Sequence, residues 1–201
     1  MKKIVILLLS MMSAFLIFSA CSTSGSTGKN ECEHSWGGWI FTEDATCLKE
    51  GTQIHITIPN GVKSIESGVF NGCSSLKSIL IANNVTIIEN HAFAECNSLI
   101  SITIPNGVTS IGDYAFANCS NLMRVVIGNG ITTIGKYAFK DSHSLTTVYY
   151  TGELSEWEKV SVDYGNYNLT SATWYYYSEE QPSDTDYLYW HYVDGLPTIW
   201  Q

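Results

Sequence analysis

Residues 76–96 of this chain read LKSILIANNVTIIENHAFAEC, and the same pattern returns every 23 residues along its middle. Six columns of identical residues keep this step: Phe70, Phe93, Phe116 and Phe139; Leu76, Leu99, Leu122 and Leu145; Ile58, Ile81, Ile104 and Ile127; Ile65, Ile88, Ile111 and Ile134; Asn60, Asn83, Asn106 and Asn129; and Cys73, Cys96 and Cys119. A fixed period of this length indicates stacked structural units, each too small to bury its apolar face alone.

Each repeat begins with a short β-strand. At Ile54, Ile56 and Ile58, β-branched residues alternate with other side chains, which predicts a strand with one face inward. Pro59 and Pro105 directly follow strands and end the pairing there, because proline has no N–H to donate. Stacking sets each strand beside its equivalent in the next turn, in a parallel sheet whose crossover is the rest of the repeat.

The crossover must be a short arc, because the repeat leaves no room for a long helix. Val85, Ile88, Ala92, Phe93 and Cys96 follow the strand, mostly at steps of three and four. That spacing fits either an irregular arc or one or two helical turns that face the core.

The repeat pattern L-x-x-I-x-I-P-x-x-V-x-x-I-x-x-x-A-F-x-x-C, which covers residues 53–150, resembles the BspA-like leucine-rich repeats of bacterial surface proteins. The resemblance implies a right-handed solenoid with a concave parallel sheet, exposure at the cell surface, and binding rather than catalysis. We therefore expect a leucine-rich-repeat solenoid. Its concave face carries short parallel β-strands, its convex arcs are short and helical or irregular, and a β-rich cap closes the C-terminal end.

The last part of the repeat region departs from this pattern, since no A-F-x-x-C segment follows it. Three residues reproduce the spacing of Leu145, Val148 and Tyr150 at a distance of 24 residues: Leu169, Ala172 and Trp174. They predict a sixth, divergent strand. Between the two strands, the spacing of Leu154 and Trp157 predicts a helical segment at 153–160 with both side chains inward.

The C-terminal segment is rich in aromatic residues. Residues 172–177 and 187–193 read as strands, and Asp194-Gly195 is a hairpin signal. A solenoid needs its end rung covered, which favours a β cap. The alternative is an aromatic platform for carbohydrate that includes Tyr149 and Trp190.

The N-terminus carries the features of an export signal. Lys2 and Lys3 precede an apolar run at residues 4–18, and small residues precede Cys21. The run is short for a membrane-spanning helix, which needs about 20 residues. The ending Ser-Ala-Cys21 resembles the lipobox of bacterial lipoproteins. That resemblance implies cleavage before Cys21, lipidation of its thiol, and an exported protein anchored by lipid at the cell membrane or cell surface. Plain secretion and a retained helix are the alternatives.

The composition divides the chain into six segments. Residues 22–30 hold no apolar side chain and read as a flexible tether. The expected segments are a signal peptide at 1–20, the lipidated cysteine and tether at 21–31, an N-terminal Cys/Trp cap at 32–52, leucine-rich repeats at 53–150, a divergent final rung at 151–178, and an aromatic β cap at 179–201.

The chain is acidic, with 10 basic and 19 acidic residues and a net charge of −9. Loss of Lys2 and Lys3 with the signal leaves 8 basic residues against 19 acidic ones, a net charge of −11. This balance argues against nucleic acid, which needs clustered lysine and arginine, and against adsorption to anionic lipid headgroups. We expect a monomer that meets the membrane only through its lipid anchor.

The N-terminal cap concentrates cysteine, histidine and tryptophan at Cys32, His34, Trp36, Trp39 and Cys47. It resembles a small Cys/Trp module of exported bacterial proteins, although the further cysteines of that module do not follow closely here. Export favours a disulfide between Cys32 and Cys47. Two free thiols are one alternative, and a metal site with His34 is the other, although structural zinc needs a fourth ligand.

Cys73, Cys96 and Cys119 could form either a ladder of metal ligands or a small core position. Their equivalent in the next turn is Ser142. A position that takes cysteine or serine favours buried free thiols, which pack as small hydrophobes. We expect neither a metal nor a cofactor.

No set of residues predicts catalysis. Serine, histidine and aspartate occur, but neither a nucleophile elbow nor a glycine-rich phosphate loop accompanies them. Glu66 and Glu89 occupy equivalent positions in adjacent turns, which is more typical of a solvated face than of a glycosidase pair. We expect a protein that is not an enzyme.

The outward strand positions form the candidate ligand-binding surface, in two columns: His55, Ser78, Ser101, Arg124 and Thr147; and Thr57, Leu80, Thr103, Val126 and Tyr149. Six strands about 4.8 Å apart and about 17 Å long bound a face of about 400 Å². A stable protein complex buries about 800 Å² on each partner. We expect weak or multivalent binding of a protein ligand by a surface recognition or adhesion module. A surface glycan bound by the C-terminal aromatics, and a structural envelope role, are the alternatives.

Overall fold

The computed structural model describes residues 34–36, 39–41, 54–58, 60–180, 187–193 and 196–200. The chain divides into two compact units, Met1–Thr46 and Cys47–Gln201. In the first unit, β1 (His34–Trp36) pairs antiparallel with β2 (Trp39–Phe41). The expected signal segment, Cys21, Cys32 and Cys47 lie outside the described residues. Within the described part of the chain, no helix has the length and apolar character that a membrane crossing requires.

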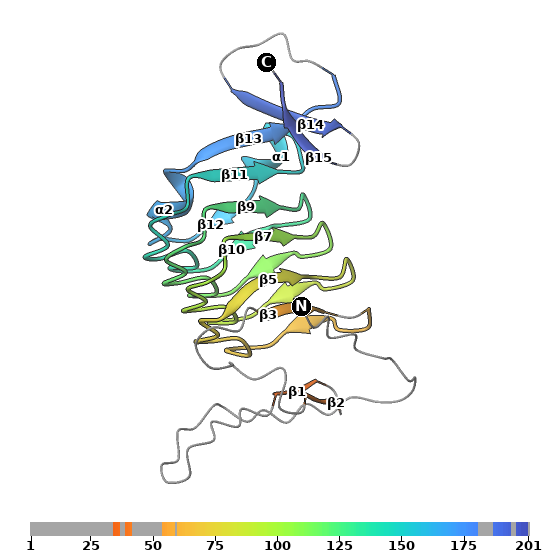
Figure 1. Cartoon of the computed structure of the whole chain (residues 1–201). Helices are drawn as coiled ribbons and strands as arrows, with labels where there is room; N and C mark the ends of the chain where they lie inside the picture. Colours follow the sequence, from red (N-terminus) through yellow and green to blue (C-terminus); the bar gives the residue numbers. More distant parts are fainter. Residues whose placement is uncertain are drawn as a thin grey trace. The chain divides into compact units, whose positions relative to one another are not determined.

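The second unit is a parallel β-solenoid (Figure 1). Its long sheet takes one strand from each repeat: β3 (Ile54–Thr57), β5 (Leu76–Leu80), β7 (Ser101–Ile104), β9 (Arg124–Ile127) and β11 (Thr147–Tyr150). Ser101 lies beside Arg124, and Arg124 lies beside Thr147, so neighbouring strands are in register at the repeat length. β3 and β5 form a pair of their own next to this sheet. The stacking predicted from the 23-residue period is confirmed.

The long sheet continues into the C-terminal segment. β13 (Thr173–Tyr177) runs parallel to β11, β14 (Leu188–Val193) runs parallel to β13, and β15 (Leu196–Ile199) returns antiparallel along β14. Val193 pairs with Leu196, which places the hairpin at Asp194-Gly195 as predicted. These strands extend the sheet beyond the last repeat, so the predicted β cap is confirmed.

Each repeat crosses back through a second, shorter sheet. Its strands are β4 (Ser64–Ile65), β6 (Ile87–Ile88), β8 (Ser110–Ile111), β10 (Thr133–Ile134) and β12 (Ser161–Val162). They pair in parallel in that order. The helical alternative for these arcs is wrong, because the described residues between β3 and β11 form short strands and turns and no α-helix. The arcs are irregular.

Left-handed backbone conformations explain why the arcs do not wind into helices. His91, Tyr114 and Tyr137 have φ values of 55°, 56° and 56°, and Gly68 occupies the equivalent position in the first turn with a φ of 67°. A second column of positive φ lies four residues further along each turn, at Gly72, Glu95, Asn118 and Asp141. A right-handed helix needs negative φ at every residue, so both columns interrupt it.

The core of the solenoid is built from the repeated columns. Phe70, Phe93, Phe116 and Phe139 form one stack, with neighbouring ring centroids 5.1–5.2 Å apart and ring planes 6–16° from parallel. The repeated leucines and both columns of repeated isoleucines are buried as well. Each unit therefore completes its core only by contact with its neighbours, as a repeat fold requires.

The divergent rung is present, but its register differs from the prediction. Val148 lies beside Trp174, an offset of 26 residues, whereas the sequence spacing suggested 24. The predicted pairing of Trp174 with Tyr150 is therefore wrong, and Tyr176 takes that place. The connection contains a helical turn, α2 (Tyr167–Thr170), which lengthens it. Leu169 in this turn is fully buried.

The helical segment predicted before this rung is also present. It is α1 (Leu154–Trp157), a single turn in which both Leu154 and Trp157 are half-buried. The Trp157 ring lies 4.2 Å from the Trp174 ring and 5.3 Å from the Tyr150 ring, measured between centroids. The turn therefore packs against the last two rungs, with its predicted residues inward.

Asn166 completes the hydrogen bonding of the last full repeat. In the earlier turns the backbone N–H of Phe93 and of Phe116 donates to a carbonyl of the next turn. The N–H of Phe139 instead donates to Oδ1 of Asn166, at 3.1 Å. The Nδ2 group of Asn166 donates to the carbonyls of Gly135 and Asp163, at 2.8 Å each. This side chain, which is 3% exposed, thus takes the place of a missing turn.

Asn166→Leu should lower the free energy of unfolding by about 2–4 kcal/mol, because it keeps the side-chain volume but leaves buried backbone groups without partners. Chemical denaturation would measure the loss. Asn168→Leu is the matched control, since Asn168 is only half-buried and contacts His143 at 3.4 Å. Equal stability of the two variants would show that Asn166 does not cap the solenoid.

Candidate binding surface

The long sheet brings the two predicted columns together on one side. We call this the outward sheet face. The first column contains Ser78, Ser101, Arg124 and Thr147, and Thr173 extends it. The second contains Thr57, Leu80, Thr103, Val126 and Tyr149, and Tyr175 and Leu188 extend it. The backbone of His55 lies beside that of Ser78, in the first column. The predicted ligand-binding positions thus share one face, which the C-terminal strands lengthen.

Side chains on this face differ in exposure. Leu80 is 64% exposed, an unusual state for a leucine in a sheet. Ser101, Thr103 and Arg124 are exposed. The half-buried members are Ser78, Val126, Thr147, Tyr149 and Tyr175. The face therefore offers hydroxyl groups, one guanidinium group and isolated apolar side chains to a ligand.

The charge of the outward sheet face differs from that of the chain. The chain has a net charge of −9, yet none of the outward positions from β5 to β14 holds a carboxylate. Arg124 is the only arginine of the sequence. Within the described residues, ion pairs join Asp141 to Lys140 and to His143, and none involves Arg124. The guanidinium group is therefore available to an external anion.

Trp190 does not form the exposed platform that the carbohydrate alternative requires. It lies on the outward side of β14 but is 0% exposed. The rings of Tyr149, Tyr177 and Tyr192 surround it at 5.6, 5.4 and 4.9 Å between centroids. Its Nε1 donates to the carbonyl of Tyr150 at 2.9 Å. Trp190 is thus the core of the C-terminal cap, and the assignment of Trp190 to a sugar platform is wrong.

The cysteine column is a buried core position, as predicted. Cys73, Cys96 and Cys119 are free and buried. The Sγ of Cys119 donates to the carbonyl of Phe93 at 3.1 Å, and the Oγ of Ser142 makes the equivalent bond to Phe116 at 2.8 Å. The position therefore needs a small side chain that can donate a hydrogen bond, which cysteine and serine share. Among the described residues no group of histidine, cysteine or carboxylate side chains could hold a metal ion.

Cys119 should resist alkylation in the folded protein. Burial raises the pKa of its thiol to about 12, only partly offset by a backbone hydrogen bond from Cys96, so almost no thiolate forms near neutral pH. Peptide mapping after iodoacetamide treatment would measure labelling at pH 8 in native buffer and in denaturant. We expect labelling only in denaturant, and equal labelling in both conditions would contradict burial of the column.

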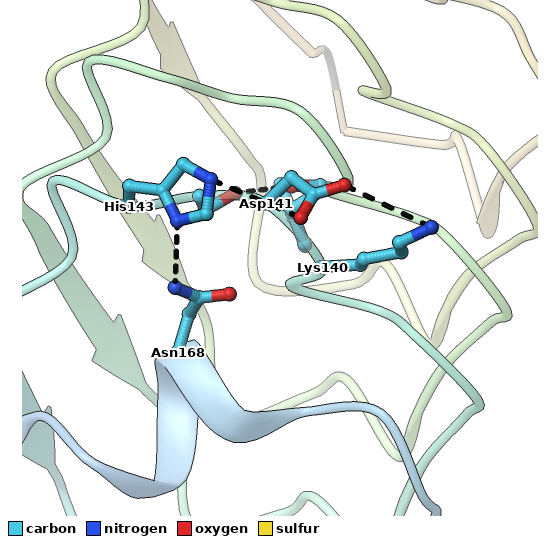
Figure 2. Close-up of polar contacts among 6 residues, drawn as sticks. Lys140, Asp141, His143 and Asn168 are labelled. Atoms are coloured by element: carbon cyan, nitrogen blue, oxygen red, sulfur yellow. Dashed lines mark hydrogen bonds and ion pairs between the residues drawn. The ribbon is translucent and has the colours of Figure 1, made fainter.

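Other polar clusters lie on the surface of the solenoid. Figure 2 shows Asp141 between Lys140 and His143, with separations of 3.8 Å to each, and Asn168 beside the His143 ring. The His143 side chain is 75% exposed, as the sequence predicted. These groups are solvated, and the contacts shown assemble no buried base or nucleophile.

The Glu66 and Glu89 pair also has a structural explanation. Glu89 accepts hydrogen bonds from the Ser64 hydroxyl and the Ser67 backbone N–H of the preceding turn. Desolvation, followed by the charge of Glu89 and a hydrogen bond with it, raises the pKa of Glu66 above its usual value. The two carboxyl groups thus connect adjacent turns.

Comparisons with known proteins agree with this architecture. A family model described as BspA type leucine rich repeat region matches residues 44–168 in six copies. No curated protein matches the chain. A solved leucine-rich repeat protein of T. pallidum is 26% identical, covers 51% of this chain and 62% of its own, and has a TM-score of 0.42. One from Bacteroides ovatus is 24% identical, covers 61% of this chain and 37% of its own, and has a TM-score of 0.40. The chain thus spans less than two thirds of either.

Proposed function

Because this chain belongs to the BspA type leucine-rich repeat family, we propose that it is a recognition protein that binds a partner protein through its outward sheet face. The exposure of Leu80 on that face is the observation that carries the proposal, since large apolar groups exposed on a regular sheet favour contact with a partner. The proposed role is adhesion or recognition without catalysis.

The proposed location is the cell surface, with the chain held there by lipid on Cys21. The apolar run at residues 4–18 and the small residues before Cys21 support export and lipidation. A short tether would keep the solenoid close to the membrane. The narrow face favours weak binding that becomes useful when many copies act together.

Leu80→Asp tests this role. Mature protein would be immobilised and exposed to detergent-solubilised surface proteins of candidate host and microbial cells. We expect Leu80→Asp to lower partner capture about tenfold, which corresponds to about 1.4 kcal/mol. Thr133→Asp is the matched control, because Thr133 is an exposed strand residue on the shorter sheet. Equal capture by both variants would rule out the outward sheet face as the binding surface.

A further inference from the structure

We propose that Arg124 and Tyr149 form a subsite on the outward sheet face for a sugar that carries a carboxylate. The inference rests on the recognition role proposed for that face and names the chemistry of its ligand. It begins with charge. A free guanidinium group stands on a sheet face without carboxylates, in a chain of net charge −9. Such a face attracts an anion only at Arg124.

The two residues are close enough to contact one small ligand. Tyr149 lies beside Val126, and Thr147 lies beside Arg124, so Arg124 and Tyr149 are diagonal neighbours on adjacent parallel strands. At about 4.8 Å between strands and about 3.3 Å per residue along them, the two Cα atoms are about 8 Å apart. Both side chains point outward, because residues two apart on a strand share a face.

Arg124 suits a carboxylate. A planar guanidinium group can donate two parallel hydrogen bonds to the two oxygens of a carboxylate, which an ammonium group cannot do in the same geometry. The neighbouring hydroxyl groups of Ser101, Thr103 and Thr147 can both donate and accept hydrogen bonds. These groups match the hydroxyl groups of a sugar ring that carries the acid.

Tyr149 suits the apolar face of the sugar. Its ring stacks on Tyr175 at 5.2 Å, and Trp190 meets it edge to face at 5.6 Å. These contacts hold the ring in place before any ligand arrives, which reduces the entropy lost on binding. On its other side lies Val126, a smaller and half-buried residue. A tyrosine in this position combines an apolar ring with a polar hydroxyl group.

The size of the face favours a sugar over a folded protein as the group that contacts Arg124. The outward sheet face is about half of the area that a stable protein complex buries on each partner. A saccharide unit needs only the few positions named above. A polymer of acidic sugars would in addition engage many surface-tethered copies together, which raises the apparent affinity.

The test uses the purified mature chain and two matched pairs of ligands. Oligogalacturonate is compared with its methyl ester, and sialyllactose with lactose, by ligand-observed NMR titration at low ionic strength. We expect at least one acidic ligand to bind tenfold or more tightly than its neutral counterpart. Because the chain is strongly acidic, unspecific adsorption of an anion is disfavoured. Equal binding within both pairs, or no binding of either acidic ligand, would overturn the subsite.

Substitutions assign the binding to the two residues. Arg124→Gln should remove the preference for the acidic ligand, and Arg124→Lys should restore it only in part, because the two-pronged hydrogen bond is lost. Lys159→Gln removes the same charge from an exposed position outside the face and should change nothing. Tyr149→Leu should weaken acidic and neutral ligands alike, in a variant shown to be folded by circular dichroism. Unchanged affinity in Arg124→Gln would overturn the proposal.

The outcome separates this inference from the general role of the face. Failure of every acidic sugar, together with loss of partner capture in Leu80→Asp, would remove the subsite and leave the recognition role standing. Normal capture in Leu80→Asp, together with acidic-sugar binding that depends on Arg124, would remove the protein partner and leave a sugar-binding face.

Discussion

Phe116→Ala should lower the free energy of unfolding by about 3–5 kcal/mol, because it opens a cavity in the middle of the phenylalanine stack. Phe116 is 0% exposed and lies between Phe93 and Phe139, at 5.2 and 5.1 Å between ring centroids. Since each turn completes the core of its neighbours, the cavity weakens contacts on both sides of the ring. Phe93→Ala should have a similar effect for the same reason.

Equilibrium denaturation in urea, followed by circular dichroism, would measure this loss. Lys77→Ala is the control, because it truncates a half-buried, charged side chain on a strand of the same solenoid. We expect a change below about 1 kcal/mol for Lys77→Ala, as for most substitutions away from the core. Similar losses in the two variants would show that the phenylalanine column does not form the core.

Trp190→Ala should have the second large effect, a loss of about 3–5 kcal/mol in the stability of the C-terminal cap. The substitution removes a fully buried indole from among three tyrosine rings and leaves the carbonyl of Tyr150 without its donor. Because β14 joins the sheet beside β13, loss of the indole should release the hairpin from the last rung.

Limited proteolysis together with urea denaturation would test this expectation. We expect early cleavage between β13 and β14 in Trp190→Ala. Trp190→Phe is the matched control, since it keeps an aromatic ring and loses chiefly the indole hydrogen bond, at about 1 kcal/mol. If Trp190→Ala leaves stability and proteolysis unchanged, Trp190 does not hold the cap.

Much of the fold was predictable because the 23-residue period repeats the same physical problem in every turn. Alternation of isoleucine with other residues predicted the strands of the long sheet, and the Asp194-Gly195 pair predicted the hairpin between β14 and β15. The cysteine column was predictable as core because serine replaces cysteine in one turn. These features depend on residues close in sequence or on an identical position in the next turn.

The arcs were harder to predict because their conformation depends on backbone angles that few residue types reveal. Gly68 and Gly72 signal a left-handed conformation, but only in the first turn. In later turns, histidine, tyrosine, glutamate, asparagine and aspartate occupy the same positions, and contacts with adjacent turns hold them there. The register of β13 was missed for a related reason, since the helical turn α2 lengthens a connection that has no counterpart in earlier repeats.

The sequence by itself determined the repeat, the identity of the core columns and the side of the sheet on which Arg124 and Tyr149 lie. A period fixes which residues share a face, because a strand alternates its side chains. Only the tertiary structure decided that Trp190 is buried while Leu80 is exposed, although both lie on the outward side of the sheet. Burial depends on which other segments cover a position, and the covering rings come from different strands. Tertiary packing therefore separates the residues that hold this protein together from those left free to meet a ligand.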